Sequence, residues 1–423
     1  MSSEWGTVST IGVLIENNGG SIKTGPFGTV LKASEYVAIG VPLISVREIG
    51  HGSFNVDSKT PRVSPQTTSR LSEYLLKSGD IVFARKGGID RCALVKEEQA
   101  GWFLGSDGIR LRPPSVCDAR FLAYSLQTQS AKEWLTQHST GSTMASLNQA
   151  TIARLPICLP SIREQKKIAD CLKAFDDRIV LLRETNTTLE AIAQALFKSW
   201  FVDFDPVRAK QEGREPEGMD ADTAALFPDS FEESELGLVP KGWIVRKADT
   251  LLTRLSTKVR YTKEQVSSFG VTPVYEQGAK ILFGYHNDKA QFSATPTEPI
   301  FIFGDHTCVT HLSCEPFDIS MNVIALKGSD RPTIWTYYAI KDKQTFQEYR
   351  RHWMELAVKD VVVAPVDVCD QFALVASSLH VRMESNTWQA NTLAALRNTL
   401  LPRLISGQLR LPEAEAILKE AAA

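Results

Sequence analysis

The stretch NTTLEAIAQALFKSWFVDFDPV, residues 186–207, closes a long helical pattern in the middle of a 423-residue chain. Apolar residues recur before and within it in alternating steps of four and three, as they do along a coiled-coil seam. The seam positions are Ile168, Leu172, Phe175, Ile179, Leu182, Asn186, Leu189, Ala193, Leu196 and Trp200. The pattern predicts one helix of about 37 residues, roughly 55 Å long at ~1.5 Å per residue.

A second copy of this pattern lies 204 residues further along the chain, at Phe372, Ala376, Leu379, Met383, Asn386, Ala390, Leu393, Arg397, Leu400 and Leu404. An apolar, proline-marked stretch precedes each helix, IARLPICLPS at 152–161 and VVVAPVDV at 361–368. Further upstream, GDIVFARKG at 79–87 resembles EPIFIFGDH at 298–306, and each is a strand pattern that opens into a polar loop. The chain is therefore predicted to be duplicated in the order domain, helix, domain, helix.

This order predicts how the two helices pack. The first helix leads away from the first domain, and the second begins beside the second domain, so both seams are buried most simply in an antiparallel coiled coil. Two mixed α+β domains would then lie at opposite ends of a rod, related by a pseudo-two-fold axis. Asn186 would fix the register opposite polar or small positions. The alternative is a pair of ordinary helices within a globular core.

One acidic segment helps to place the boundaries. Residues 205–235 hold ten acidic and three basic side chains, a balance of -7, so the remainder of a chain whose net charge is -2 carries +5. Because the segment has turn residues and no periodicity, we predict a connector there. The predicted parts are a first domain at 1–160, a first helix at 161–204, the acidic connector at 205–236, a second domain at 237–365, a second helix at 366–406 and a tail at 407–423.

Composition and cysteine usage indicate the compartment. The chain is 43% hydrophobic and 23% charged, as globular proteins are, and it has no apolar run of the ~18 residues that a membrane span needs. The start MSSEWGTVST lacks the features of a signal peptide. Seven scattered cysteines, an odd number, suit a reducing environment. We therefore expect a cytoplasmic protein.

Longer strings carry a resemblance that spans essentially the whole chain. KTGPFGTVLKASEY at 23–36, PLISVREIG at 42–50 and GDIVFARKG resemble the first target recognition domain of Type I restriction-modification specificity subunits. GSTMASLNQATIARLPICLPSIREQKKIADCLKAFDDRI at 141–179 is similar to the end of such a domain and the start of the family's spacer helix. ALFKSWFVDFDPVRAK at 195–210 and LLPRLISGQL at 400–409 are similar to the ends of the two spacer helices.

The resemblance implies a non-catalytic, DNA-binding subunit that takes part in defence against foreign DNA. Each of its two target recognition domains would read one half of a bipartite DNA site, and the helices would set the gap between the halves. Its partners would be two methyltransferase subunits, which methylate adenine at N6 with S-adenosylmethionine, and motor-nuclease subunits, which use ATP and magnesium. The chain itself would bind no cofactor.

Motif searches agree with a non-catalytic chain. We find no GxxxxGKS/T phosphate loop, no dinucleotide fingerprint and no Asn-Pro-Pro-aromatic tetrapeptide. Asp203 and Asp205 are interpreted as part of a helix exit closed by Pro206. His306, Cys308, His311 and Cys314 are zinc-ligand types, but their spacing lacks the usual two pairs separated by a longer loop, so we predict no metal site.

DNA readers need side chains that form directed hydrogen bonds to base edges and cations that contact phosphates. In the first domain the candidates are Arg47, Arg85, Lys86, Gly87, Arg91, Ser142 and Thr143. In the second domain they are Gln277, Lys280, Tyr285, His286, His306 and Thr310. For each, a solvated surface group is the alternative. Two other functions stay open, a stand-alone sequence-specific regulator of DNA and a structural scaffold that binds no DNA.

Overall fold

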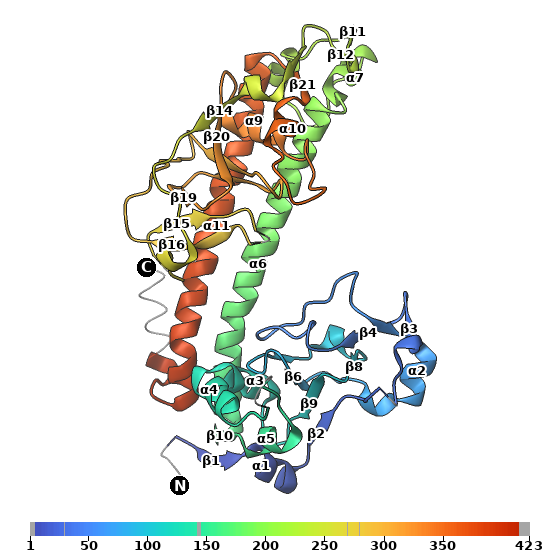
Figure 1. Ribbon diagram of the computed structural model, residues 1–423, viewed down its shortest axis with the longest axis vertical. Coiled ribbons are helices and arrows are strands. Elements are labelled where there is room, and N and C mark those ends of the chain that lie inside the picture. The colour runs from blue at the N-terminus through green and yellow to red at the C-terminus, as the bar shows by residue number, and fades with distance from the viewer. Residues whose placement is uncertain (1–4, 29, 142–144, 269, 279, 414–423) are drawn as a thin grey trace. The chain divides into compact units, whose positions relative to one another are not determined.

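The computed structural model describes residues 5–28, 30–141, 145–268, 270–278 and 280–413 (Figure 1). It divides into two compact units, Met1–Ile179 with Asn391–Ala423, and Val180–Ala390. Each unit contains one α+β domain and a part of each of two long helices.

The first domain is built on a four-stranded antiparallel sheet in the order β2-β9-β6-β7. Its strands are β2 (Ser21–Thr24), β6 (Ile81–Ala84), β7 (Cys92–Leu94) and β9 (Gly108–Arg112). All four side chains of β6 are buried, because alternate residues of a strand point to opposite faces and both faces are covered. Ile81 and Phe83 lie in one hydrophobic cluster, and Val82 and Ala84 lie in another.

The other elements of this domain surround that sheet. β1 (Thr7–Thr10) pairs with β10 (Pro156–Leu159), so the two ends of the domain meet. A small second sheet in the order β3-β5-β4-β8 comprises β3 (Tyr36–Val37), β4 (Val41–Ile44), β5 (Arg62–Val63) and β8 (Phe103–Leu104). The helices are α1 (Ile11–Asn18), α2 (Pro65–Arg70), α3 (Ala119–Gln127), α4 (Gln129–Gln137) and α5 (Gln149–Arg154).

The second domain repeats the first. Its main sheet has the order β14-β20-β17-β18, formed by β14 (Leu252–Leu255), β17 (Ile300–Gly304), β18 (Thr310–Ser313) and β20 (Val323–Gly328). Phe301 and Phe303 of β17 lie in one cluster and Ile300 and Ile302 in another, as in β6. β13 (Ile244–Lys247) pairs with β21 (Asp360–Val363) as β1 pairs with β10. The predicted duplication and the two strand patterns are confirmed.

The second unit has further elements beside its main sheet. A three-stranded sheet in the order β16-β15-β19 comprises β15 (Thr272–Tyr275), β16 (Leu282–His286) and β19 (Asp318–Ile319). A hairpin joins β11 (Phe231–Ser234) to β12 (Gly237–Pro240). The short helices are α7 (Asp205–Gln211), α8 (Ala221–Ala225), α9 (Thr333–Ile340) and α10 (Trp353–Ala357).

The two long helices are α6 (Ile162–Phe201) and α11 (Val366–Ser406). None of the twenty predicted seam positions is exposed. In the first unit, Ile168, Leu172 and Phe175 share a hydrophobic cluster with Leu400 and Leu404. The periodicity therefore identified the buried stripe of both helices, as expected for apolar residues at heptad spacing.

Polar contacts show that the two helices are antiparallel within each unit. In the first unit Glu164 lies near Arg410, whereas Asp176 forms an ion pair with Arg397. In the second unit Asn186 contacts Asn386, whereas Glu190 lies 3.9 Å from His380. In both units, residues that come later in α6 contact residues that come earlier in the second helical segment. The predicted antiparallel coiled coil is confirmed in each unit.

A buried polar cluster joins the second domain to its segments of α6 and α11. The Tyr338 hydroxyl lies 3.0 Å from Oε2 of Glu190 and 2.8 Å from Nε2 of His380. Lys341 forms an ion pair with the same glutamate. Burial opposes ionisation of Glu190, but the hydrogen bonds from Lys341 and Gln194 hold its pKa below the usual value. The charged pair is thus satisfied inside the unit, as buried charges must be.

The segment predicted as an acidic connector contains α7, α8 and β11, and Val207 and Phe227 lie in the hydrophobic core of the second unit. α6 ends at Phe201, and Pro206 lies in the first turn of α7. The role of this segment as a connector stays a prediction. None of the described helices combines the length and apolar character needed to cross a membrane.

Candidate nucleic-acid interface

In the first domain, β6 carries the candidate Arg85 at its end. The backbone N–H of Arg85 donates to Asp107 O at 2.8 Å, and its carbonyl accepts from Leu147 N at 2.8 Å. The guanidinium lies 5.0 Å from the ring centroid of Phe27, a cation–π contact that orients it. Phe27 is itself exposed, so a rigid backbone presents a cation and an aromatic ring at one surface.

The residues after Arg85 form a tight turn. Lys86 and Gly87 are exposed, and Gly87 has φ 62°, a left-handed conformation that a side chain disfavours. Arg91 closes the turn, because its Nη2 lies 3.3 Å from Gly87 O and its backbone N–H donates to Gly88 O at 3.0 Å. Arg91 therefore stabilises the loop that presents Arg85 and Lys86.

The remaining first-domain candidates are Arg47, Ser142 and Thr143. Arg47 lies in the turn after β4, where its Nη2 is 2.5 Å from Asp57 Oδ1 and its Nη1 donates to Lys59 O at 3.2 Å. Its charge is thus already paired. The pKa of Asp57 lies below the usual value because the Lys59 N–H and Arg47 both hydrogen-bond its carboxylate.

Ser142 and Thr143 lie outside the described residues. The chain that flanks them reaches the Arg85 turn, since Ser146 forms a β-bridge with Lys86 and exchanges backbone hydrogen bonds with Thr140. The described residues Ser146 and Leu147 are therefore held beside the turn that carries Arg85 and Lys86.

The second domain has the same backbone arrangement with a different residue. Asp305 follows β17 as Arg85 follows β6. Its N–H donates to Asn322 O at 2.9 Å, just before β20, as Arg85 donates to Asp107 just before β9. Its carbonyl accepts from His352 N at 2.7 Å, as that of Arg85 accepts from Leu147. Position 85 of the first domain is therefore matched by a carboxylate in the second.

Two second-domain candidates meet beside Asp305. The His306 N–H donates to Gln277 Oε1 at 2.9 Å, so the loop after β15 and the loop after β17 form one surface. Within the described part of the chain, His306 Nδ1 and Thr307 Oγ1 are buried without a protein partner. Lys280 is exposed, and Thr310 begins β18 with a half-buried side chain.

The structure gives His286 a structural role in place of the predicted base contact. Its side chain is buried and stacks on Tyr261 at 4.2 Å between ring centroids. Nε2 lies 2.9 Å from Asp318 Oδ2, and Nδ1 accepts from the Asp288 N–H at 3.1 Å. Both ring nitrogens are therefore used within the domain. Tyr285 is half-buried, and burial raises the pKa of its hydroxyl.

Sequence reasoning missed an exposed segment next to Asp305. Tyr349 is 73% exposed and Arg351 80%, and Phe346 is also exposed. Tyr349 packs edge-on against His306, with 4.7 Å between ring centroids. The available signal was the repeat itself, since α10 (Trp353–Ala357) follows this segment as α5 (Gln149–Arg154) follows the candidates Ser142 and Thr143.

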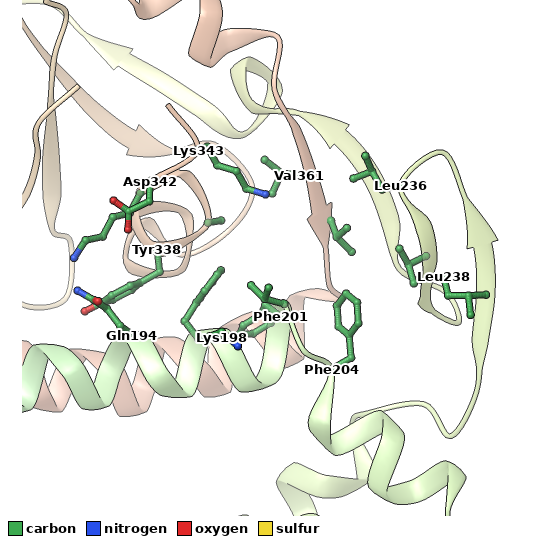
Figure 2. A pocket seen from close by; sticks show the side chains of 16 residues that line it. Gln194, Lys198, Phe201, Phe204, Leu236, Leu238, Tyr338, Asp342, Lys343 and Val361 are labelled. Atoms are coloured by element: carbon green, nitrogen blue, oxygen red, sulfur yellow. The ribbon is translucent and has the colours of Figure 1, made fainter. Parts of the chain in front are cut away.

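Two further observations concern metal-ligating side chains and a pocket. Among the described residues, no group of three or more His, Cys, Asp or Glu side chains could hold a metal ion. Figure 2 shows a pocket of about 450 Å³ in the second unit, lined by residues of α6, the β11–β12 hairpin, α9 and β21. Its walls are mostly apolar, with Phe201, Leu236 and Leu238 beside Lys198 and Lys343. That lining includes no histidine, cysteine or serine.

Comparisons with known proteins extend these observations. The family described as "Type I restriction modification DNA specificity domain" matches residues 10–191. The Type I restriction enzyme MjaIX specificity subunit of Methanocaldococcus jannaschii is 23% identical over an alignment that covers 90% of each chain. The HindI specificity subunit of Haemophilus influenzae is 33% identical over 36% of this chain and 34% of its own. The crystal structure of a Type I restriction-modification S subunit from M. genitalium has a similar fold, with a TM-score of 0.56, 16% identity, and coverage of 94% of this chain and 95% of that one.

Proposed function

We propose that the chain is a specificity subunit of the Type I restriction-modification family, whose DNA specificity domain matches residues 10–191, and that each of its two domains reads one half of a bipartite DNA site. The duplicated sheet carries the proposal. In each domain, one doubly buried strand ends in a loop whose first residue is fixed by the same two backbone hydrogen bonds. Two similar but non-identical surfaces suit the reading of two different half-sites.

The long helices would set the number of base pairs between the half-sites. α6 and α11 have 40 and 41 residues, and none of their predicted seam positions is exposed. The half-buried Asn186 and the buried Asn386 would fix the register in the second unit, the role for which buried asparagine in coiled coils is best attested. We assign residues 1–160 and 237–365 to the two target recognition domains, 161–204 and 366–406 to the spacer helices, 205–236 to the connector and 407–423 to the tail.

The chemistry would reside in partner subunits. Two methyltransferase subunits would dock on this chain and methylate adenine with S-adenosylmethionine, and motor-nuclease subunits would supply ATP-dependent cleavage with magnesium. This chain would bind none of these cofactors and would act in the cytoplasm. Its contribution would be to place the methyltransferases on a chosen sequence.

The proposal is tested by exchanging residues 1–150 for those of another specificity subunit whose methylated sequence is known. The exchange should change one half of the methylated sequence and leave the other half as it was. A change in both halves or in neither would refute the assignment of one half-site to each domain. A stand-alone regulator would bind a specific duplex tightly without any methyltransferase, whereas a scaffold would bind none with or without it.

A further inference from the structure

We propose that residues 345–353 of the second domain form a base-contacting loop, in which Arg351 and Tyr349 help to determine the second half-site. This inference rests on the proposed function, because it concerns the way in which the second domain reads DNA.

The loop is held by buried anchors. Asp305 is 9% exposed, and it accepts the His352 N–H at its carbonyl (2.7 Å) and the Trp353 N–H at its carboxylate (2.9 Å). The imidazole of His352 is fully buried, with Nδ1 3.1 Å from Glu355 and Nε2 3.0 Å from Glu348 O. The backbone that carries Tyr349 and Arg351 is thus fixed by the hydrogen bonds of Asp305 and His352. A preorganised loop loses little conformational entropy when it binds a ligand.

The loop occupies a position that corresponds to a predicted reading segment of the first domain. There, the carbonyl of Arg85 accepts from Leu147, just beyond the predicted contacts Ser142 and Thr143. In the second domain, the carbonyl of Asp305 accepts from His352, just beyond Tyr349 and Arg351. The repeat therefore assigns this loop to the side of the domain on which the first domain carries its candidates.

Charge supports the same assignment. Where the first domain has the cation Arg85 at the end of the central strand, the second has Asp305, so its cations must come from elsewhere. Arg351 provides one, since its Nε lies 3.8 Å from Asp305 Oδ2, too far for a hydrogen bond, and its side chain is 80% exposed. Arg254, also exposed, lies 4.9 Å from the Trp353 ring and adds a second cation next to the loop.

The two exposed side chains have the chemistry of base readout. Arginine can donate two hydrogen bonds to O6 and N7 of guanine in the major groove, which distinguishes guanine from the other bases. Tyr349 contacts His306 with its ring and is 73% exposed, so it remains accessible to a base. Gln277, which binds the His306 N–H, adds a directed polar group at the same surface. Duplex DNA is therefore the partner that these groups fit.

The neighbouring Arg350 differs in a way that helps the design of the test. Its guanidinium forms ion pairs with Glu348 at 3.2 Å and Glu355 at 2.7 Å, so it belongs to the internal bracing of the loop. Arg382, an exposed arginine on α11, lies outside the loop and is the better control for a general loss of positive charge.

The experiment compares wild type, Arg351→Ala, Arg351→Lys, Tyr349→Ala and Arg382→Ala, each assembled with the methyltransferase subunits. Binding is measured to a duplex that carries the methylated sequence and to duplexes altered in one half-site. Arg351→Ala should weaken cognate binding about 5- to 150-fold while non-cognate binding changes little, because one bidentate base contact contributes that range. Arg351→Lys should also lose discrimination, since lysine keeps the charge but not the paired donors. The affected base positions should all lie in the second half-site.

Equal weakening of cognate and non-cognate binding by Arg351→Ala would overturn the proposal, because it would indicate a phosphate contact. Unchanged binding and methylation by both Arg351 variants and Tyr349→Ala would overturn it as well. So would the same effect from Arg382→Ala. If the wild-type complex binds no duplex at all, the proposed function itself fails, which is a different result from a wild type that binds and a variant that does not differ.

Discussion

Replacement of the asparagine pair in the coiled coil tests whether a polar contact fixes its register. Asn386 is 1% exposed, and its Nδ2 donates to Asn186 Oδ1 at 2.8 Å. Asn186 Nδ2 in turn lies 2.8 Å from Met383 O and 3.0 Å from Thr387 Oγ1. Asn186→Leu removes the acceptor of a buried donor, whereas Asn386→Leu leaves the half-buried Asn186 with its two other contacts.

The two single variants should therefore differ. Asn186→Leu should destabilise the second unit by about 1–3 kcal/mol, the cost of an unsatisfied buried polar group. Asn386→Leu should cost about 0.5–1.5 kcal/mol, the net value of one hydrogen bond. The double variant should be close to wild type or more stable, because replacing both partners by apolar groups leaves no orphaned polar atom. The magnitude of the coupling energy would then be about 1.5–4.5 kcal/mol, the sum of the two single costs.

Hydrogen–deuterium exchange of the full chain is the appropriate assay, because a chain with two units need not unfold in a single step. Peptides from residues 180–195 and 380–390 report opening of the helix pair, and peptides from the first domain serve as an internal control. Additive effects in the double variant, within about 0.5 kcal/mol, would show that the two asparagines do not depend on each other. That result would remove the pair from the account of register.

Three other outcomes are expected. Arg85→Ala with Lys86→Ala should cost a few kcal/mol of specific binding, at ~1–3 kcal/mol per bidentate contact, and unaltered affinity and methylation would exclude that loop from base readout. Four residues inserted after Ala193 lengthen a helix by ~6 Å and rotate the downstream part of the helix by only ~40°. At ~3.4 Å per base pair, the gap in the methylated site should therefore grow by about one or two base pairs between unchanged half-sites. Active enzyme with an unchanged gap would contradict the spacer role. Burial lowers the pKa of His311 from 6.5 in the unfolded chain to about 4, and the nearby His380 lowers it further. Between these pH values the unfolded state binds more protons than the folded state, so the free energy of unfolding should fall as the pH drops from about 6.5 to about 4. His311→Gln should flatten this dependence in a pH series of urea titrations.

The sequence carried enough information to predict the duplicated fold, because heptad spacing and strand alternation are local signals. The buried stripe of α6 and the strand β6 were both evident in this way. The partner of Asn186 was not, since it depends on the register between helix segments that lie 200 residues apart in the chain. A shift by the repeat length of 204 residues aligns Leu182 with Asn386. In the structure, the residue that contacts Asn386 is Asn186.

The candidate site was predicted less well, for the same physical reason. His286 follows a glycine-marked stretch and resembled an exposed loop residue, yet Asp318, 32 residues away, holds it in the interior. Tyr349 and Arg351 lie in a stretch without a motif, and their place beside His306 depends on long-range contacts such as the hydrogen bonds from His352 and Trp353 to Asp305. Burial and long-range hydrogen bonds decide which polar side chains are available to a ligand, and neither is a local property of the sequence.

The central claim is that this chain directs methylation to a bipartite sequence through two separate readers. Sequencing the methylated bases of a genome in cells that express the chain with its methyltransferase tests it most directly. The account predicts methylated adenines in a split, asymmetric motif whose two short halves are separated by a fixed number of unspecified base pairs. A contiguous or palindromic motif, or a methylation pattern that does not depend on this chain, would contradict it.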